Sequence, residues 1–303
     1  MTIAPEAPAR SIEFLELDLT ARCQLACSHC YAEAGPTKGH GSMTGDDWRH
    51  VIDEAAEVGV ETVQLIGGEP TLHPNFSELA WHALDVGLRV RVYSNLYRVR
   101  EEHWDLFGHP DVRLATSYYS DAPAEHDEIT GRKGSHDSTR ANIVEALRRG
   151  IDVKVGIIHM RDGQRSQEAF AEMVELGATQ VRIDRVRAVG NAVQGVLPST
   201  SALCGRCGEG KAAILPDGTV APCGMGRFMP AGNVRGSSLK QVLAGSAWSS
   251  VVASIPRRGQ AGCTPDEDSC MPSPGVDMAC NPDKDGSDCS PAETPACNPA
   301  YDD

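Results

Sequence analysis

The sequence lacks three features that would assign it to large classes of protein. It contains no run of about 18 apolar residues, which excludes a membrane-spanning helix. The N-terminus, MTIAPEAPARSIEF, has neither a basic start nor an apolar run, which excludes a secretory signal and predicts a cytoplasmic protein. Basic residues are outnumbered, with 28 Lys and Arg against 42 Asp and Glu, and the formal charge of −14 argues against a nucleic-acid partner.

Cysteine, by contrast, is abundant, with 11 in a chain of 303 residues. In the reducing cytosol thiols stay reduced, so clustered cysteines indicate metal binding or catalysis rather than disulfides. Hydrophobic residues make up 41% of the chain, which is typical of a globular protein. The length allows one large core with a small appendage, or two modest domains.

Residues 12–188 alternate strand-like and helix-like patterns, which predicts a mostly parallel sheet with helices outside and ligands at the carboxyl ends of the strands. After an extension over 1–11, we expect a core over 12–190. A closed eight-fold barrel needs about 250 residues, so the segment predicts an α/β fold with a partial (β/α)6 barrel. The predicted strands are 12–19, 60–66, 88–94, 112–118, 151–158 and 181–186, and the predicted helices begin near Thr44 and cover 75–86, 135–149 and 166–176.

The composition changes near residue 190, and 191–303 is predicted to form a small cysteine-rich iron–sulfur extension. The turn Pro216-Asp217-Gly218 predicts a hairpin of 212–215 with 219–221, followed by a helix over 237–243. The tail, 256–303, holds 8 Pro, 5 Cys and 10 acids against 3 bases, so it cannot fold by apolar burial. It is either loose or ordered by metal–thiolate bonds.

Three cysteines, Cys23, Cys27 and Cys30, form a C-x3-C-x2-C pattern after the first predicted strand. Three thiolates at this spacing can hold one corner of a [4Fe–4S] cluster and leave the fourth iron open to a small molecule. One alternative is a zinc site completed by His29, although structural zinc usually takes two short pairs of ligands. The other alternative is loose thiols, and the spacing favours the cluster.

These cysteines and the residue after them resemble the signature of radical S-adenosylmethionine (SAM) enzymes. Four residues at the end of the second strand, Gly-Gly-Glu-Pro, resemble the family's GGEP segment, in which glycines admit close backbone approach and Glu69 can accept from an ammonium group. Polar residues ending the next two strands are placed like the ribose and carboxylate contacts of SAM. The resemblance implies these cofactor-binding residues: Tyr31, Gly67, Gly68, Glu69, Pro70, Ser94, Asn95 and Ser117.

The resemblance also implies the chemistry. The open iron of a [4Fe–4S] cluster on Cys23, Cys27 and Cys30 would chelate SAM, and one electron would cleave SAM to a 5′-deoxyadenosyl radical. That radical abstracts a hydrogen atom from an unactivated carbon, while the protein positions the reacting atoms and excludes water and oxygen. An electron donor such as flavodoxin or ferredoxin would be a partner.

A second resemblance covers Cys207, Gly218 and Cys223, which are spaced like the start of the SPASM/Twitch extension of many radical SAM enzymes. It implies one or two auxiliary [4Fe–4S] clusters. An alternative is a zinc ribbon on Cys204 and Cys207, although the second C-x2-C of a ribbon is missing. The candidate auxiliary ligands are Cys204, Cys207, Cys223, Cys270, Cys280, Cys289 and Cys297.

The tail departs from the usual spacing of that extension, and eight cysteines follow residue 200 where the usual extension has seven. We interpret Cys263, alone at the start of the tail, as a candidate catalytic thiol that donates a hydrogen atom to a substrate radical. The alternatives are that Cys263 is one more cluster ligand, or that the whole tail is a disordered, solvated segment.

The predicted substrate is an aminosugar or aminoglycoside, as for epimerases of the neomycin type, which would make the chain an isomerase or oxidoreductase of antibiotic biosynthesis. Three features favour this: only 22 residues precede Cys23, a surplus cysteine is present, and the acidic balance would attract a polycation. The alternative is a ribosomal peptide maturase that forms thioether or carbon–carbon crosslinks in a short precursor peptide.

Overall fold

The computed structural model describes residues 12–193, 195 and 197–257. Within them, the frame is one nine-stranded sheet of order β6-β5-β4-β3-β2-β1-β7-β8-β9. Neighbouring strands among the first six pair in parallel, and β7 pairs in parallel with β1. The strands are β1 (Phe14–Asp18), β2 (Thr62–Ile66), β3 (Arg89–Tyr93), β4 (Val112–Tyr118), β5 (Val153–His159), β6 (Gln180–Arg185), β7 (Lys211–Ile214), β8 (Thr219–Ala221) and β9 (Gly232–Asn233).

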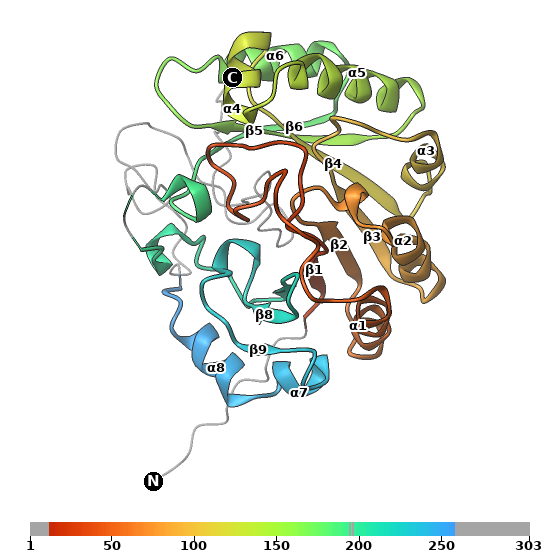
Figure 1. Cartoon of the computed structure of the whole chain (residues 1–303), viewed down its shortest axis with the longest axis vertical. Coiled ribbons are helices and arrows are strands. Elements are labelled where there is room, and N and C mark those ends of the chain that lie inside the picture. The colour runs from red at the N-terminus through yellow and green to blue at the C-terminus, as the bar shows by residue number, and fades with distance from the viewer. Residues whose placement is uncertain (1–11, 194, 196, 258–303) are drawn as a thin grey trace, which may run out of the picture.

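The connections between the parallel strands are helical, and Figure 1 shows the longer helices along the outer side of the curved sheet. The larger hydrophobic core lies between these helices and one face of the sheet. None of the described helices is long and apolar enough to cross a membrane. The helices are α1 (Gly45–Glu57), α2 (Phe76–Asp85), α3 (Glu101–Phe107), α4 (Pro123–Thr130), α5 (Ser135–Arg148), α6 (Ser166–Glu175), α7 (Leu239–Leu243) and α8 (Ser246–Ala253).

Helix α1 shows why the predicted pattern holds. The Thr44 side chain accepts a hydrogen bond from the Asp47 backbone N–H, and the Asp47 carboxylate accepts one from the Thr44 N–H at 2.8 Å, which completes a capping box. The side chains of Trp48, Val51 and Ile52 are buried, as the spacing predicts. The capped helix α1 therefore packs its apolar face against the sheet.

The sheet is open, because β6 and β9 are its two ends, and the six parallel strands β1–β6 with the helices between them form the predicted partial barrel. The predicted hairpin is also present as β7 and β8, which pair antiparallel. It is not set apart from the barrel sheet, however, since Lys211 of β7 lies opposite Phe14 of β1. A parallel sheet that is not closed leaves an unpaired edge at β1, and the hairpin satisfies the hydrogen bonds of that edge.

Candidate active site

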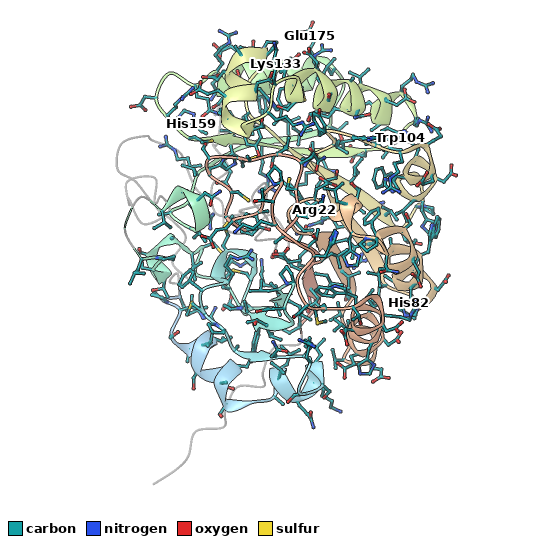
Figure 2. All side chains as sticks on the ribbon, viewed as in Figure 1. Arg22, His82, Trp104, Lys133, His159 and Glu175 are labelled. Atoms are coloured by element: carbon teal, nitrogen blue, oxygen red, sulfur yellow. The ribbon has the colours of Figure 1, made fainter. Side chains whose placement is uncertain are left out.

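The loop after β1 carries the three cysteines of the first motif. Cys23 is buried, Cys27 and Cys30 are half-buried, and all three line one pocket at the carboxyl ends of the strands. Figure 1 shows this loop in red in the middle of the view, and the label of Arg22 in Figure 2 marks it among the surrounding side chains. The fold thus gathers the three thiols where a parallel α/β sheet binds ligands.

The thiols do not converge on a single point. Among the described residues, no three His, Cys, Asp or Glu side chains are grouped closely enough to hold one metal ion. A tetrahedral zinc would need such a group, whereas an iron–sulfur cube is held corner by corner by thiolates that stand apart. The donor set of Cys23, Cys27 and Cys30 therefore fits a [4Fe–4S] cluster with one open iron better than it fits zinc.

Burial makes all three thiols weak acids when no cation is bound. Burial, with a smaller effect of nearby Glu69, raises the pKa of Cys23 to about 12. Burial is also the main cause of a raised pKa at Cys27 and at Cys30, and at Cys27 the neighbouring thiols add to it. Such groups are stable as thiolates only with a bound cation, which iron would supply.

Cys23 is also held by hydrogen bonds to its sulfur. Its Sγ accepts from the backbone N–H of Leu25 at 3.4 Å and from Nδ2 of Asn95 at 3.5 Å. The amide of Asn95 is fixed in this orientation because its Oδ1 accepts from Gln24 Nε2 at 3.1 Å and from the Tyr97 N–H at 2.8 Å. The end of β3 therefore orients one cluster ligand directly.

The two glycines after β2 allow one backbone to lie against another. A Cβ at Gly67 would lie 2.5 Å from the Thr20 carbonyl oxygen, and one at Gly68 would lie 2.4 Å from that of Arg22. The N–H groups of Gly68 and Glu69 donate to the same carbonyls, at 2.6 and 2.9 Å. Although both glycines also line the pocket, their close approach in this structure is to the cysteine loop, which they hold in place.

The carboxylate of Glu69 is completely buried and hydrogen-bonded. Its Oε1 accepts from the Thr71 hydroxyl at 2.7 Å and from the Ser94 hydroxyl at 2.9 Å, and its Oε2 accepts from the Asn95 N–H at 2.8 Å. Burial raises the pKa of Glu69 although these donors oppose the shift. In this structure Glu69 joins the ends of β2 and β3, just before the short helix η1 (Pro70–Leu72), and its contact with SAM stays a prediction.

Two tyrosines that the motifs did not indicate line the same pocket. The hydroxyls of Tyr93 and Ser117 share a hydrogen bond of 2.9 Å. The ring of Tyr119 meets that of His29 edge-on, with centroids 5.0 Å apart. Burial lowers the pKa of His29 to about 4, so its imidazole is neutral. The signal available in the sequence was the position of Tyr93 and Tyr119 at strand ends.

The loop after β6 closes over the cysteine loop, which sequence patterns did not indicate. Asn191 donates from its backbone N–H to the Cys30 carbonyl at 2.9 Å, and from Nδ2 to the Cys27 carbonyl at 3.1 Å. Gly190 has a φ of +62°, and a Cβ there would lie 2.4 Å from the carbonyl oxygens of Cys30 and Tyr31. A glycine is therefore required for this contact.

The second group of cysteines also comes together. The β7–β8 hairpin brings the Sγ atoms of Cys207 and Cys223 within 2.8 Å, and both residues belong to one buried cluster with Cys204. The backbone N–H of Gly226 donates to Cys223 Sγ at 3.2 Å. The remaining predicted sulfur sites lie outside the described residues: Cys263, Cys270, Cys280, Cys289 and Cys297.

Comparisons with known proteins agree with this geometry. Residues 17–176 match the family described as the radical SAM superfamily, and 204–270 match SPASM, an iron–sulfur cluster-binding domain. The chain is 32% identical over 168 residues to an AdoMet-dependent heme synthase of Methanosarcina barkeri, covering 55% of this chain and 48% of that protein. It is 28% identical over 180 residues to the sporulation killing factor maturation protein SkfB of Bacillus subtilis, covering 59% and 44%.

A longer match, over 272 residues, is 27% identical to the PqqA peptide cyclase of Ruegeria pomeroyi and covers 75% of this chain and 71% of that one. Among solved structures, Streptococcus suis SuiB bound to the precursor peptide SuiA superposes with a TM-score of 0.68 at 12% identity, covering 84% and 68% of the two chains. The chain spans about half the length of the first two relatives. The thiol triplet, the partial barrel and the family match over 17–176 agree, and this chain belongs to the radical SAM superfamily, with [4Fe–4S] and SAM binding in its barrel and a SPASM region after it.

Proposed function

We propose that this chain cleaves SAM reductively in the pocket beside Cys23, Cys27 and Cys30 and removes a hydrogen atom from a peptide. When bound, the cluster and SAM supply a carbon-centred radical, which ordinary side chains cannot. The observation that carries the proposal is the arrangement of three separated thiols around one pocket with the ends of β2, β3 and β4.

The chain's own residues would hold and orient these groups. The three thiols hold the cluster, and the backbone N–H of Leu25 and the side-chain amide of Asn95 orient the sulfur of Cys23. Ser117 and Asn95 offer polar groups to SAM at the pocket wall. The buried rings of Tyr93 and Tyr119 exclude water from the reacting atoms, which prevents loss of the radical to side reactions.

A peptide substrate has more support than an aminosugar. Two of the relatives reported above are a killing-factor maturation protein and a peptide cyclase, and a third superposes as a complex with a precursor peptide. The expected attraction of a polycation rested on the charge of the whole chain. The charged residues that line the pocket from β6 and the segment after it are Asp184, Arg185 and Arg187, which a polycation would not favour.

The SAM-cleaving step is tested with anaerobically reconstituted protein, dithionite and SAM. We expect 5′-deoxyadenosine from the wild-type chain and none from Cys30→Ala. The matched control is Ser28→Ala, which changes an exposed residue of the same motif and should keep the activity. Equal product from Cys30→Ala and the wild type would refute the proposal.

The second cysteine group is tested by iron content. Each [4Fe–4S] cluster adds about four iron atoms, so a reconstituted chain with a filled SPASM region should bind about eight or more. We expect Cys223→Ser to lower the iron content while the ultraviolet–visible absorbance of the first cluster is retained. An unchanged iron content would show that Cys207 and Cys223 hold no cluster.

The substrate class is tested with short precursor peptides encoded beside the gene. A crosslink removes two hydrogen atoms from the peptide, which mass spectrometry detects. Epimerisation leaves the mass unchanged in ordinary water and adds one deuterium in deuterium oxide. Turnover of an aminosugar, with no change in any peptide, would overturn the peptide proposal but leave the SAM-cleaving step intact.

A further inference from the structure

One residue of the SPASM region lines the pocket that also holds the three thiols of the first motif. Met225 belongs to the short helix η4 (Gly224–Gly226), two residues after Cys223, and it is buried. The other described residues that line this pocket lie between 23 and 187, in the barrel and its loops. Met225 is therefore a point at which the second cysteine group can influence a ligand of the barrel.

The turn that carries Met225 is held on both sides. Before it, Cys223 Sγ accepts a hydrogen bond from the Gly226 N–H at 3.2 Å, and the same N–H donates to the Cys223 carbonyl at 3.0 Å. After it, Arg227 pairs with Asp18 at the end of β1. Because the turn is closed on the sulfur of Cys223, a cluster that binds this sulfur also sets the position of Met225.

Tyr31 packs between the two groups of cysteines. It contacts the hydrophobic cluster that contains Cys223 and Met225, and it also contacts the cluster that contains Cys23. A Cβ at Gly224 would lie 3.3 Å from Cε2 of Tyr31, so the turn lies directly against this ring. Protein interiors are close-packed, and a displacement of the turn is therefore transmitted to the ring and to the pocket wall.

We propose that Met225 is a positioning residue for SAM, and that a cluster on the second cysteine group is needed to hold it in place. This rests on the function proposed above, in which SAM binds in this pocket. A methionine side chain is flexible and polarizable, so it packs well against an apolar part of a ligand. Loading of the second group can change the affinity for SAM only through a contact that differs between the loaded and unloaded chains. Met225 provides this contact.

The first test measures the affinity of the reconstituted full chain for SAM by anaerobic equilibrium dialysis, without a reductant. We expect Met225→Ala to weaken SAM binding about tenfold through the loss of a buried apolar contact. Met225→Leu, which is of similar size, should retain most of the affinity. Wild-type affinity in Met225→Ala would overturn the proposal.

Met229→Ala is the matched control for this variant. Met229 packs against the same hydrophobic cluster as Met225, but it is not among the described residues that line the pocket. Its truncation removes a similar amount of packing from the SPASM region, so we expect it to lower stability and to leave the affinity for SAM unchanged. An equal loss of SAM affinity in Met229→Ala and Met225→Ala would reduce Met225 to a general packing role and overturn the proposal.

The second test removes the cluster rather than the methionine. Cys223→Ser should weaken SAM binding about tenfold, and Cys207→Ser, which unloads the same group from the other side of the hairpin, should do the same. Cys223→Ser/Met225→Ala should bind SAM no more weakly than either single variant, because both changes remove one contact. Losses that multiply to about a hundredfold, or wild-type affinity in both serine variants, would overturn the proposal.

Iron content and SAM cleavage separate this inference from the function on which it rests. About four iron atoms per chain and the absorbance of the first cluster show that a serine variant is folded and has lost only the second cluster. An unchanged iron content in both serine variants would overturn the coupling. The dialysis requires no SAM cleavage, so a failure of the proposed function shows separately, as missing 5′-deoxyadenosine from the wild-type chain.

Discussion

Asp18 and Arg227 form a buried ion pair, with 3.1 Å between Asp18 Oδ2 and Arg227 Nη1. Asp18 ends β1, just before the cysteine loop, and Arg227 follows Cys223. The guanidinium of Arg227 also lies 5.7 Å from the ring centroid of Tyr31, next to Cys30. This pair therefore joins the SPASM region to the loop that holds the first cluster.

Removing the cation of this pair should be costly. Arg227→Met leaves the Asp18 carboxylate buried without its partner, and we expect a loss of about 3 kcal/mol in the free energy of unfolding. Burial already raises the pKa of Asp18, which Arg227 opposes. Asp18→Asn/Arg227→Met should recover part of the loss. Anaerobic thermal unfolding measures both, and equal stabilities of the wild type and Arg227→Met would contradict the assignment.

Gly190 should be essential for the cover over the cysteine loop. Gly190→Ala adds a Cβ that would lie 2.4 Å from two carbonyl oxygens, in addition to the strain of a positive φ. We expect lower stability by about 2 kcal/mol or more and a lower iron content. Gly150→Ala is the matched control, because its φ is +73° but nothing lies near its added Cβ. Similar losses in both variants would rule out a special role for the contact.

Asn95 should influence the reduction potential of the first cluster. Its Nδ2 donates to Cys23 Sγ at 3.5 Å, and hydrogen bonds to cluster sulfurs are among the factors that set the potential. Asn95→Asp replaces this donor with an acceptor of the same shape that carries negative charge, so we expect a more negative potential. A redox titration followed by electron paramagnetic resonance measures it. Asn233→Asp, exposed and on β9, should leave the potential unchanged.

Stability should fall in acid because of His126. Burial, with a smaller effect of neighbouring His136, lowers the pKa of His126 to about 3 from its usual 6.5. Between these values the unfolded chain binds the proton and the folded chain does not, so stability falls as the pH falls through this range. The slope reaches about 1.4 kcal/mol per pH unit. His126→Gln should flatten the slope in denaturant titrations, and His50→Gln, at an exposed histidine, should not.

Local sequence patterns were sufficient to predict much of the barrel. The strand predicted at 112–118 is β4, and Thr44 caps α1 as expected. The hairpin turn at Pro216-Asp217-Gly218 brings Cys207 and Cys223 together, because a turn of that length returns the chain beside itself. Each of these features depends on residues close to one another along the chain.

Other features depended on distant residues. No pattern indicated α3, whose N-cap residue Arg100 makes no side-chain capping hydrogen bond, or the contact of Asn191 with the cysteine loop. The sequence likewise did not predict the hydrogen bonds of the buried Glu69 carboxylate, because their donors follow two different strands, β2 and β3. Pairing of β7 with β1 joins segments about 200 residues apart, which local periodicity cannot report.

By itself, the sequence determined the chemistry: the spacing of Cys23, Cys27 and Cys30 and the Gly-Gly-Glu-Pro segment are enough to indicate an iron–sulfur cluster and SAM. Only the tertiary structure decided which charges line the pocket. The net charge of −14 suggested a cationic ligand, but the pocket is lined by Arg185 and Arg187 as well as by Asp184. A sum of charges over the chain cannot say which side chains the fold brings to one pocket, because these side chains come together only when the strands pair.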